Sequence, residues 1–188
     1  MQEYETTKKL NEKIEISDAK VSDAQDLIRI TKEAWLDTYV NEKYGITRED
    51  ILSRDWDSEA RRTRYQKNIE SAGKGENNRW LVAKNEAREI IGFSHVSKSE
   101  DFGKIERIFI LSEYRGLGVG KQLMTAALDW LGTEKDIKLV VVSYNKGALG
   151  FYEKMGFQRS TAEVPLASTQ LPTGKCIRRI EMIKFAPK

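Results

Sequence analysis

The feature that most constrains this chain is a strand pattern that runs directly into a glycine-rich turn and then into a helix pattern. Residues 105–111 are typical of a strand, and residues 119–131 carry apolar side chains at helical spacing. The turn between them holds three glycines flanked by two cations, Arg115, Gly116, Gly118, Gly120 and Lys121. Glycines allow a tight turn with uncovered backbone N–H groups, and the positive end of the helix dipole adds to them. The segment therefore predicts a binding site for phosphate groups.

Two other phosphate-binding patterns fit this turn poorly. A nucleoside-triphosphate loop requires one more residue between its outer glycines, and Gln122 replaces the hydroxyl that would hold magnesium. A dinucleotide fingerprint requires its third glycine one residue after Gly120, in the first βαβ unit of a chain. The turn therefore excludes the first pattern and disfavours the second.

Periodicity along the chain predicts one α/β (α+β) domain at residues 14–188, behind a flexible polar leader at residues 1–13. The expected strands lie at residues 14–16, 80–83, 90–96, 105–111, 137–142 and 177–185. The expected helices begin after Ser22 or Asp23, at residue 119, and at residue 145, the last running to Met155 and stopped by Gly156 in the position of a C-cap.

Three segments carry more specific expectations. Residues 36–71 indicate one or two short helices with loops, and residues 71–78 indicate a loop. The strands at 80–83 and 90–96 should pair in antiparallel fashion. The apolar run at 137–142 should be buried on both faces of the sheet.

Composition excludes several classes of function. The formal net charge of +3 over 188 residues is too small and too mixed to indicate nucleic-acid binding. The sole cysteine, Cys176, and the sole histidine, His95, cannot build a zinc site, so no metal is expected. His95 lies in an apolar run and is interpreted as a structural strand residue. No apolar run suits a membrane helix and no signal-peptide pattern is present, so we expect a cytoplasmic protein without a membrane partner.

Two motifs of the chain resemble those of the GNAT superfamily of N-acetyltransferases. Residues 115–120, Arg-Gly-Leu-Gly-Val-Gly, satisfy the signature [QR]-x-x-G-x-[GA]. Residues 145–157 match the later signature N-x-x-A-x-x-F-Y-x-K-x-G-F. The motifs follow each other in the family's order, separated by one expected helix and one buried strand. The resemblance covers residues 80–157 and extends to residues 14–35, but it says little about residues 36–78 or 164–188.

The resemblance implies a mixed, mostly antiparallel sheet flanked by helices. The strands at 105–111 and 137–142 would splay apart and form a slot for acetyl-CoA, the cosubstrate. The pantetheine arm would pair with the backbone at Ile108, Phe109 and Ile110 and touch the side-chain amide of Asn145. The turn that takes the pyrophosphate would comprise Arg115, Gly116, Leu117, Gly118, Val119, Gly120 and Lys121.

The implied reaction must deprotonate an amine, with a pKa of about 10, and release a thiolate, with a pKa of about 8.5. Tyr152 matches the family tyrosine that protonates the thiolate; the alternative is an aromatic residue with its hydroxyl in water. Glu106 is the candidate base because strand alternation places it on the face of Ile108 and Ile110. Its alternative role is a salt bridge or substrate anchor. Direct transfer in a ternary complex is expected, so Cys176 is not required as a nucleophile.

The acceptor amine stays open at this level. Residues 105–120 look like the corresponding segment of polyamine and diamine acetyltransferases. Residues 36–60 hold seven acidic and three basic side chains, which would attract a cationic acceptor if they line its site. A solvated helix surface is the alternative interpretation.

The sequence also allows functions other than acetylation of a small cationic amine. Acetylation of protein or peptide N-termini, as in the ribosomal-protein type, is the first alternative. A non-catalytic coenzyme A-binding module is the second, and a dinucleotide-dependent oxidoreductase comes last. Dimers are common in the family, so the resemblance also allows a homodimer.

Overall fold

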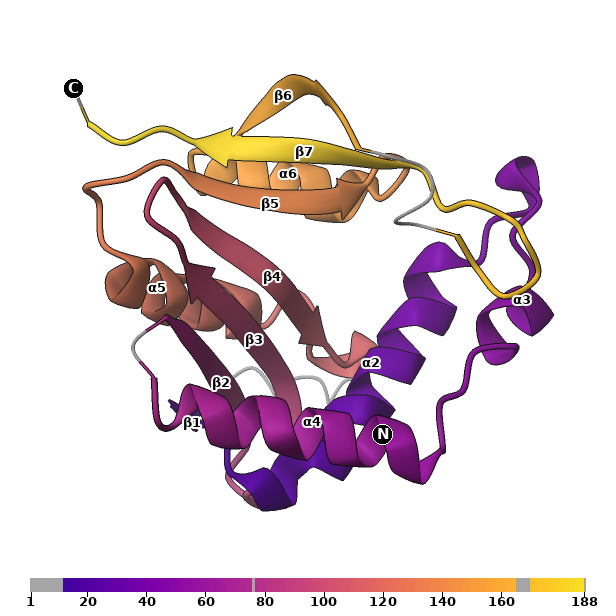
Figure 1. Cartoon of the computed structure of the whole chain (residues 1–188), viewed down its shortest axis with the longest axis horizontal. Coiled ribbons are helices and arrows are strands. Elements are labelled where there is room, and N and C mark those ends of the chain that lie inside the picture. Colours follow the sequence, from indigo (N-terminus) through magenta and orange to yellow (C-terminus); the bar gives the residue numbers. More distant parts are fainter. Residues whose placement is uncertain (1–11, 76, 165–169, 188) are drawn as a thin grey trace.

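The computed structural model describes residues 12–75, 77–164 and 170–187, and these residues build a seven-stranded sheet (Figure 1). The strands are β1 Glu15–Asp18, β2 Asn78–Lys84, β3 Ile90–Lys98, β4 Gly103–Ile110, β5 Ile137–Val142, β6 Gln158–Glu163 and β7 Arg179–Lys184. Their order across the sheet is β1-β2-β3-β4-β5-β7-β6. β4 and β5 run parallel, whereas the other neighbouring strands are antiparallel. The expectation of a mixed, mostly antiparallel sheet is confirmed.

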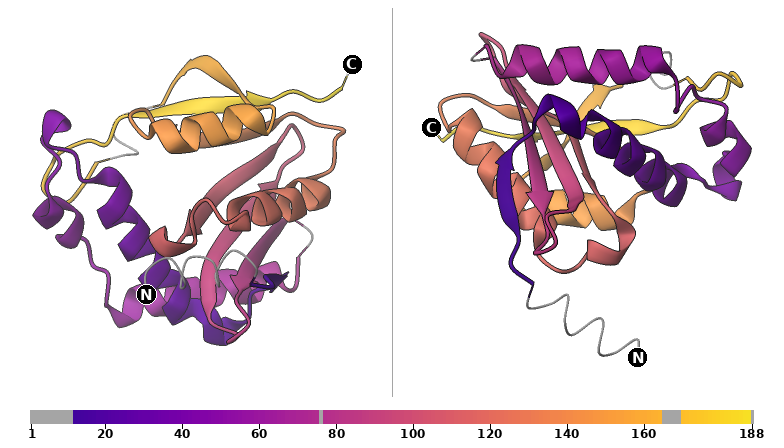
Figure 2. Two further views of the ribbon diagram at one scale, coloured as in Figure 1. Left: turned by 180° about the vertical axis from the view of Figure 1, so that it is seen from behind. Right: turned by 90° about the horizontal axis from the view of Figure 1, so that it is seen from below.

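Helices cover both faces of this sheet. The helices are α2 Ala24–Tyr39, α3 Arg48–Leu52, α4 Glu59–Ala72, α5 Val119–Leu131 and α6 Lys146–Lys154, with 3-10 turns η1 Val21–Asp23, η2 Glu42–Tyr44 and η3 Ser112–Tyr114. Figure 2 shows α4 and α5 on opposite faces. Tyr65 of α4 packs against Trp80 of β2, with ring centroids 5.6 Å apart. Leu131 of α5 lies so close to Gly103 of β4 that an added Cβ would be 3.1 Å from it. None of the described helices is both long and apolar enough to cross a membrane.

Elements with clear end signals lie where the sequence places them. α5 and β5 have the predicted bounds, and α6 follows its N-cap residue Asn145. Gly156, just beyond α6, has a φ of +89°, a conformation that glycine adopts without a Cβ penalty. β2 and β3 form the predicted antiparallel pair.

Three predictions need correction. β5 is not buried on both faces, because Val140 is 36% exposed and borders the cavity described below. The segment after residue 36 is more regular than predicted: α2 continues to Tyr39, and α4 is 14 residues long. β6 was not predicted, because it is an edge strand of mostly polar residues without apolar alternation.

The predicted polar leader lies mostly outside the described residues. Its last two residues are described, and both contact the turn after β2. The backbone N–H of Lys13 donates to Glu86 Oε1 at 3.2 Å, and the backbone N–H of Glu86 donates to Glu12 Oε1 at 3.3 Å.

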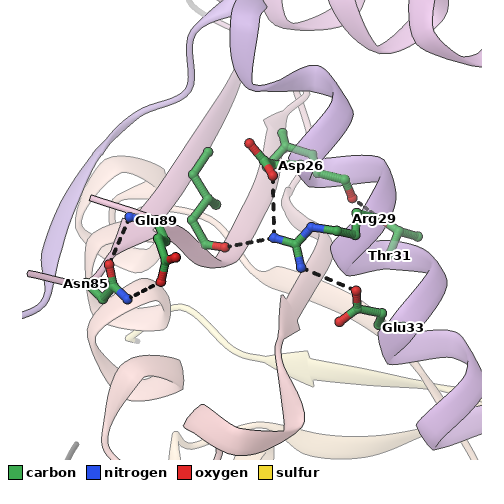
Figure 3. Close-up of polar contacts among 8 residues, drawn as sticks. Asp26, Arg29, Thr31, Glu33, Asn85 and Glu89 are labelled. Atoms are coloured by element: carbon green, nitrogen blue, oxygen red, sulfur yellow. Dashed lines mark hydrogen bonds and ion pairs between the residues drawn. The ribbon is translucent and has the colours of Figure 1, made fainter. Parts of the chain in front are cut away.

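Polar contacts hold α2 against the sheet (Figure 3). Arg29 donates to the backbone oxygen of Ile90, at the start of β3, over 3.5 Å. The same guanidinium forms ion pairs with Asp26 at 3.4 Å and with Glu33 at 3.3 Å. Such exposed pairs contribute little to stability individually, but they orient Arg29 toward the sheet. They matter here because the second half of α2 lines the cavity.

A second apolar cluster joins the segment after α2 to the C-terminal loop. Its buried members are Ile46, Ile51, Trp56, Val142, Leu171 and Ile177. Figure 1 shows this loop, in yellow, beside α3. The two segments that the family resemblance left undescribed therefore pack together beyond the end of β5.

Replacement of Asp50 with asparagine tests this junction. The Asp50 carboxylate is buried. It accepts one hydrogen bond from Lys175 Nζ at 2.6 Å and another from the backbone N–H of Thr47 at 2.7 Å. We expect Asp50→Asn to lower the free energy of unfolding at pH 7 by about 1–2 kcal/mol. The loss is smaller than for a fully buried ion pair, because Lys175 is partly exposed and solvent weakens its attraction to Asp50. Denaturant titration measures the change, and Asp129→Asn, at an exposed position of α5, is the control.

The same pair predicts a pH dependence. Lys175 and the Thr47 N–H hold the pKa of Asp50 well below its usual value of 3.8. The stabilisation is therefore complete above the unfolded-state pKa and is lost as the pH falls below it. Between pH 7 and pH 3 the difference between wild type and Asp50→Asn should narrow; a constant difference would contradict this assignment.

Candidate active site

The site begins where β4 and β5 separate. The two strands pair only from Gly103 with Ile137 to Ile105 with Leu139. Beyond this point β5 stays paired with β7, while β4 turns away, as Figure 1 shows. Among the described residues, 106–110 of β4 have no β5 partner. The predicted splay is therefore present, and it leaves one backbone edge of β4 open.

A cavity of about 1040 Å³ occupies this opening. Ile108, Phe109 and Ile110 line it from β4, and Val140 lines it from β5. An extended chain could pair with the open edge of β4 by strand-like hydrogen bonds. The three β4 residues named by the resemblance therefore line the cavity along the unpaired part of β4.

The three glycines of the turn serve two different structural needs. Gly116 and Gly118 have φ values of +80° and +84°, a region that L-residues rarely adopt. An added Cβ on either would meet nothing within 4 Å, so both backbones face open space. Gly120 is required for close packing instead, since its Cβ would lie 2.9 Å from Ile110 Cδ1. All three glycines line the cavity.

The start of α5 suits a phosphate group. Gly118 is its N-cap residue and supplies no side-chain hydrogen bond to the first turn. The first backbone N–H groups of a helix have no intrahelical acceptor, and the helix dipole adds positive potential there. Lys121 lines the cavity, whereas Leu117 and Val119 do not. Val119 is fully buried in the core, so it can contribute only backbone groups to a ligand.

Arg115 bridges the glycine turn to α2. Its Nε donates to the backbone oxygen of Ile110 at 3.1 Å, and its Nη2 lies 3.2 Å from Asp37 Oδ2. The arginine lines the cavity, but part of its charge is already balanced by Asp37. Its first task is to fix the turn against α2.

Asn145 caps α6 at the cavity wall. Its Oδ1 accepts a hydrogen bond from the backbone N–H of Ala148 at 3.0 Å. The amide group is thereby oriented, and its Nδ2 is the end that can donate to a ligand.

Tyr152 of α6 lines the cavity and is 8% exposed. Its ring packs against Phe151 and Phe157 at centroid distances of 5.4 and 6.1 Å. Burial, and to a lesser extent Tyr39, raises the pKa of its hydroxyl well above the usual 10. The phenol therefore keeps its proton at any physiological pH and can act as a donor.

Glu106 lies at a β-bulge in β4. His95 of β3 pairs with Arg107, and Val96 pairs with Ile105, so Glu106 is the extra residue. Its carboxylate accepts from Ser97 Oγ at 2.9 Å and lies 2.8 Å from Lys104 Nζ.

The bulge corrects one expectation about Glu106. Strand alternation would place its side chain with Ile108 and Ile110, but Ile110 faces Gly120 of α5 while Glu106 faces Ser97 on the other side. Glu106 still lines the same cavity. Burial raises its pKa, but Lys104, Ser97 and His95 together lower it below 4.5. The group is therefore an ionised carboxylate at neutral pH.

His95 and Cys176 lie outside the lining of this cavity. His95 stacks on Trp80 at 4.1 Å, and burial together with Arg107 lowers its pKa to about 4. It is a neutral strand residue, as its apolar sequence context indicated.

The expected acidic acceptor wall is not built. Of the seven acidic residues at positions 36–60, Asp37 alone lines the cavity, and it is engaged by Arg115. Three others form ion pairs elsewhere: Asp50 with Lys175, Asp57 with Lys32, and Glu59 with Arg62. The local excess of carboxylates therefore reflects caps and surface pairs.

Besides Arg115 of the glycine turn, five arginines of the described chain line the cavity where acidic side chains were expected. They are Arg54, Arg61, Arg64, Arg107 and Arg179. They come from the loop after α3, from α4, from β4 and from β7, so sequence reasoning missed them. The one local signal is the run at residues 61–64, Arg-Arg-Thr-Arg.

Sequence comparison agrees with this geometry. The sequence profile of the Acetyltransferase (GNAT) family matches residues 33–157. A Bacillus subtilis (strain 168) protein whose acetyltransferase activity is inferred is 36% identical over 76 residues, covering 40% of this chain and 51% of that protein. The uncharacterized YyaT of the same strain is 38% identical over 60 residues, 32% of this chain and 40% of that protein. These matches span about half, or less, of the length of the curated relatives.

Solved structures share the fold at low sequence identity. The PaiA N-acetyltransferase of Thermoplasma acidophilum in complex with coenzyme A has a TM-score of 0.71 and 21% identity, covering 92% of this chain and 99% of that one. A phosphinothricin acetyltransferase of Sinorhizobium meliloti in complex with acetyl-CoA has a TM-score of 0.64 and 18% identity, covering 92% and 88%. At such identities the likeness establishes the fold alone. Because the family profile matches more than half of the sequence and the splayed sheet matches those structures, the chain belongs to the acetyltransferase (GNAT) family.

Proposed function

We propose that this protein transfers the acetyl group of acetyl-CoA to an amine by direct attack in a ternary complex. The observation that carries the proposal is the cavity between β4 and β5. It brings together the uncapped start of α5, the open edge of β4, and the side chains of Tyr152 and Glu106. A phosphate cradle, a strand edge and a proton donor are the parts that transfer from a phosphorylated thioester requires.

Each part has a defined task in this proposal. The turn at Gly116 and Gly118, with Lys121, holds the pyrophosphate of the cosubstrate. Backbone N–H groups of β4 near Ile108 polarise the thioester carbonyl. Tyr152 gives its proton to the departing thiolate. Since no acyl-enzyme is formed, no nucleophilic side chain is needed.

The test is calorimetric titration with acetyl-CoA, with NADH and ATP as controls. Saturable binding of acetyl-CoA alone supports the cofactor assignment. Release of free thiol with a panel of amines then measures transfer. Binding without thiol release for any amine or peptide would favour the non-catalytic coenzyme A-binding module, and binding of NADH alone would overturn the proposal.

Glu106 would take the proton of the acceptor amine, directly or through a water molecule. Its lowered pKa means that it is ionised at neutral pH, whereas a free amine loses its proton only near pH 10. Glu106→Gln should reduce kcat/KM about tenfold near pH 6.5, with a loss that shrinks toward pH 9.5, where the amine is deprotonated by solvent.

The pH–rate profiles of Glu106→Gln and of Glu113→Gln measure this effect. Glu113 is exposed and lies outside the cavity lining, so it controls for loss of one surface charge. A tenfold loss that is the same at every pH would make Glu106 a substrate anchor and leave the base elsewhere.

The resemblance to polyamine acetyltransferases bears on the cofactor rather than on the acceptor. It rests on residues 105–120, which supply β4 and the glycine turn. The part of the cavity away from that turn is lined by arginines, which disfavour a polycation. Acetylation of a protein or peptide N-terminus is the second candidate. A cytoplasmic location and a homodimer stay predictions from the sequence.

A further inference from the structure

Two of the arginines and the glycine turn lie at opposite sides of the sheet. Arg61 and Arg64 belong to α4, and Gly118 stands at the start of α5. Figure 2 shows these two helices on opposite faces. One cavity nevertheless touches both groups, because it passes between the separated ends of β4 and β5. The arginine side is therefore the part left for the acceptor when the turn holds the cosubstrate.

Aromatic rings hold the guanidinium groups by their faces. Arg54 Cζ lies 4.5 Å from the ring centroid of Trp35 and 5.7 Å from that of Trp56. Arg61 Cζ lies 4.7 Å from the Trp56 ring, and its Nε donates to the backbone oxygen of Asp55. A guanidinium group that stacks on a ring uses its flat face for that contact, so the N–H donors at its edge can still bind a ligand. Those donors suit a planar carboxylate or a phosphate.

Four arginines of the cavity lining, the cluster of Arg54, Arg61, Arg64 and Arg107, form no ion pair with a carboxylate in the described part of the chain. The Nε of Arg54 is buried and has no hydrogen-bond partner there. Arg107 donates to Tyr65 Oη at 3.0 Å, a neutral group. A buried donor without an acceptor costs free energy, which a bound oxyanion would recover.

The cluster adjoins the reacting groups. Burial raises the pKa of the Tyr39 hydroxyl, and the charges of Arg179, Arg107 and Arg54 oppose that rise. Tyr39 in turn contributes to the raised pKa of the Tyr152 hydroxyl. Tyr39 and Tyr152 line the same cavity as Arg54, Arg107 and Arg179, so the arginines and the reacting groups border one space.

Building on acetyl transfer to an amine, we propose that the acceptor is an amine that also carries a carboxylate or a phosphate. Arg54, Arg61 and Arg107 bind that anionic group, and its amine then faces Glu106 and Tyr152. The cluster thus selects against polyamines, whose charge it repels. The residues act on binding of the acceptor and take no part in bond making.

The test compares acceptors that differ only in the anionic group. Amino acids are paired with their amides, and 2-aminoethyl phosphate with 2-aminoethanol, at saturating acetyl-CoA. The charged member of at least one pair should have a kcat/KM about tenfold or more above its neutral partner, and spermidine should be the poorest acceptor. The carboxylate and phosphate pairs separate the two anion chemistries. Equal rates within both pairs, or preference for spermidine, would overturn the inference.

Variants test whether the cluster is responsible. Arg54→Gln should raise the KM of the anionic acceptor at least about tenfold while changing the KM of its neutral partner less than about twofold. Arg62→Gln is the matched control, because Arg62 lies in α4 beside Arg61 but pairs with Glu59 and does not line the cavity. Equal effects of Arg54→Gln on both members of a pair would show a merely structural role.

A binding measurement separates this inference from the proposed function. Protein saturated with acetyl-CoA, whose phosphate cradle is then filled, is titrated with inorganic phosphate and with acetate. At least one should bind saturably to wild type and to Arg62→Gln but not to Arg54→Gln. If acetyl-CoA binds and neither anion does, the inference fails while the proposed function stands. If acetyl-CoA does not bind, the proposed function fails first.

Discussion

Tyr152→Phe should lower kcat about 100-fold at neutral pH while leaving the Kd of acetyl-CoA within about twofold of wild type. Tyr152 lines the cavity, and burial raises the pKa of its hydroxyl, so the phenol is protonated whenever a thiolate must leave. Because a free thiol has a pKa of about 8.5, below that of the phenol, Tyr152 donates to the sulfur while the C–S bond breaks rather than to a free thiolate. The phenylalanine ring keeps the packing against Phe151 and Phe157, so the fold and the cofactor cradle should persist.

The measurement is steady-state thiol release combined with calorimetric binding of acetyl-CoA. Tyr114→Phe is the matched control, because it removes another buried hydroxyl, which accepts from Asn85 Nδ2 outside the cavity lining. That variant should lose stability without a comparable loss of kcat. An unchanged kcat in Tyr152→Phe would remove Tyr152 as the acid. A loss of acetyl-CoA affinity in proportion to kcat would make it a binding residue instead.

Sequence reasoning succeeded where a local signal decides the structure. The bounds of α5 follow from apolar side chains at helical spacing between Gly118 and Gly132, both of which have positive φ. The N-cap of α6 at Asn145 follows from its place in a motif and from its short amide side chain. The splay of β4 from β5 was predicted only through the family resemblance, since no local pattern encodes it.

Sequence reasoning failed where tertiary contacts decide. The buried side of α4 consists of Arg61, Tyr65 and Ile69, so an apolar-periodicity count does not register a 14-residue helix. The bulge at Glu106 depends on a one-residue mismatch with β3, which leaves no mark on the sequence of β4 itself.

The charge of the acceptor side illustrates the same limit. The acidic excess of residues 36–60 is visible in the sequence, but three of those carboxylates pair with Lys32, Arg62 and Lys175. The arginines that line the cavity come from four separate parts of the chain. Net charge along a segment therefore does not report the charge that faces a site, because folding decides which charges neutralise each other.

Gly118→Ala should raise the Kd of acetyl-CoA about 100-fold and also reduce the free energy of unfolding by about 1–2 kcal/mol. The stability loss arises because alanine is strained at a φ of +84°. The affinity loss has a second cause: a methyl group at this position projects into open space at the start of α5, where the N–H groups must approach a pyrophosphate. Relief of the strain by local rearrangement would also move those N–H groups.

Gly174→Ala separates the two causes. Gly174 has a φ of +83° and open space around its Cβ position, but it lies in the C-terminal loop outside the cavity lining. It should show the same loss of stability by denaturant titration and no change in the Kd of acetyl-CoA. Equal weakening by both substitutions would mean that affinity follows stability rather than the cradle. Unchanged affinity in Gly118→Ala, with the stability loss present, would move the phosphate site away from the start of α5.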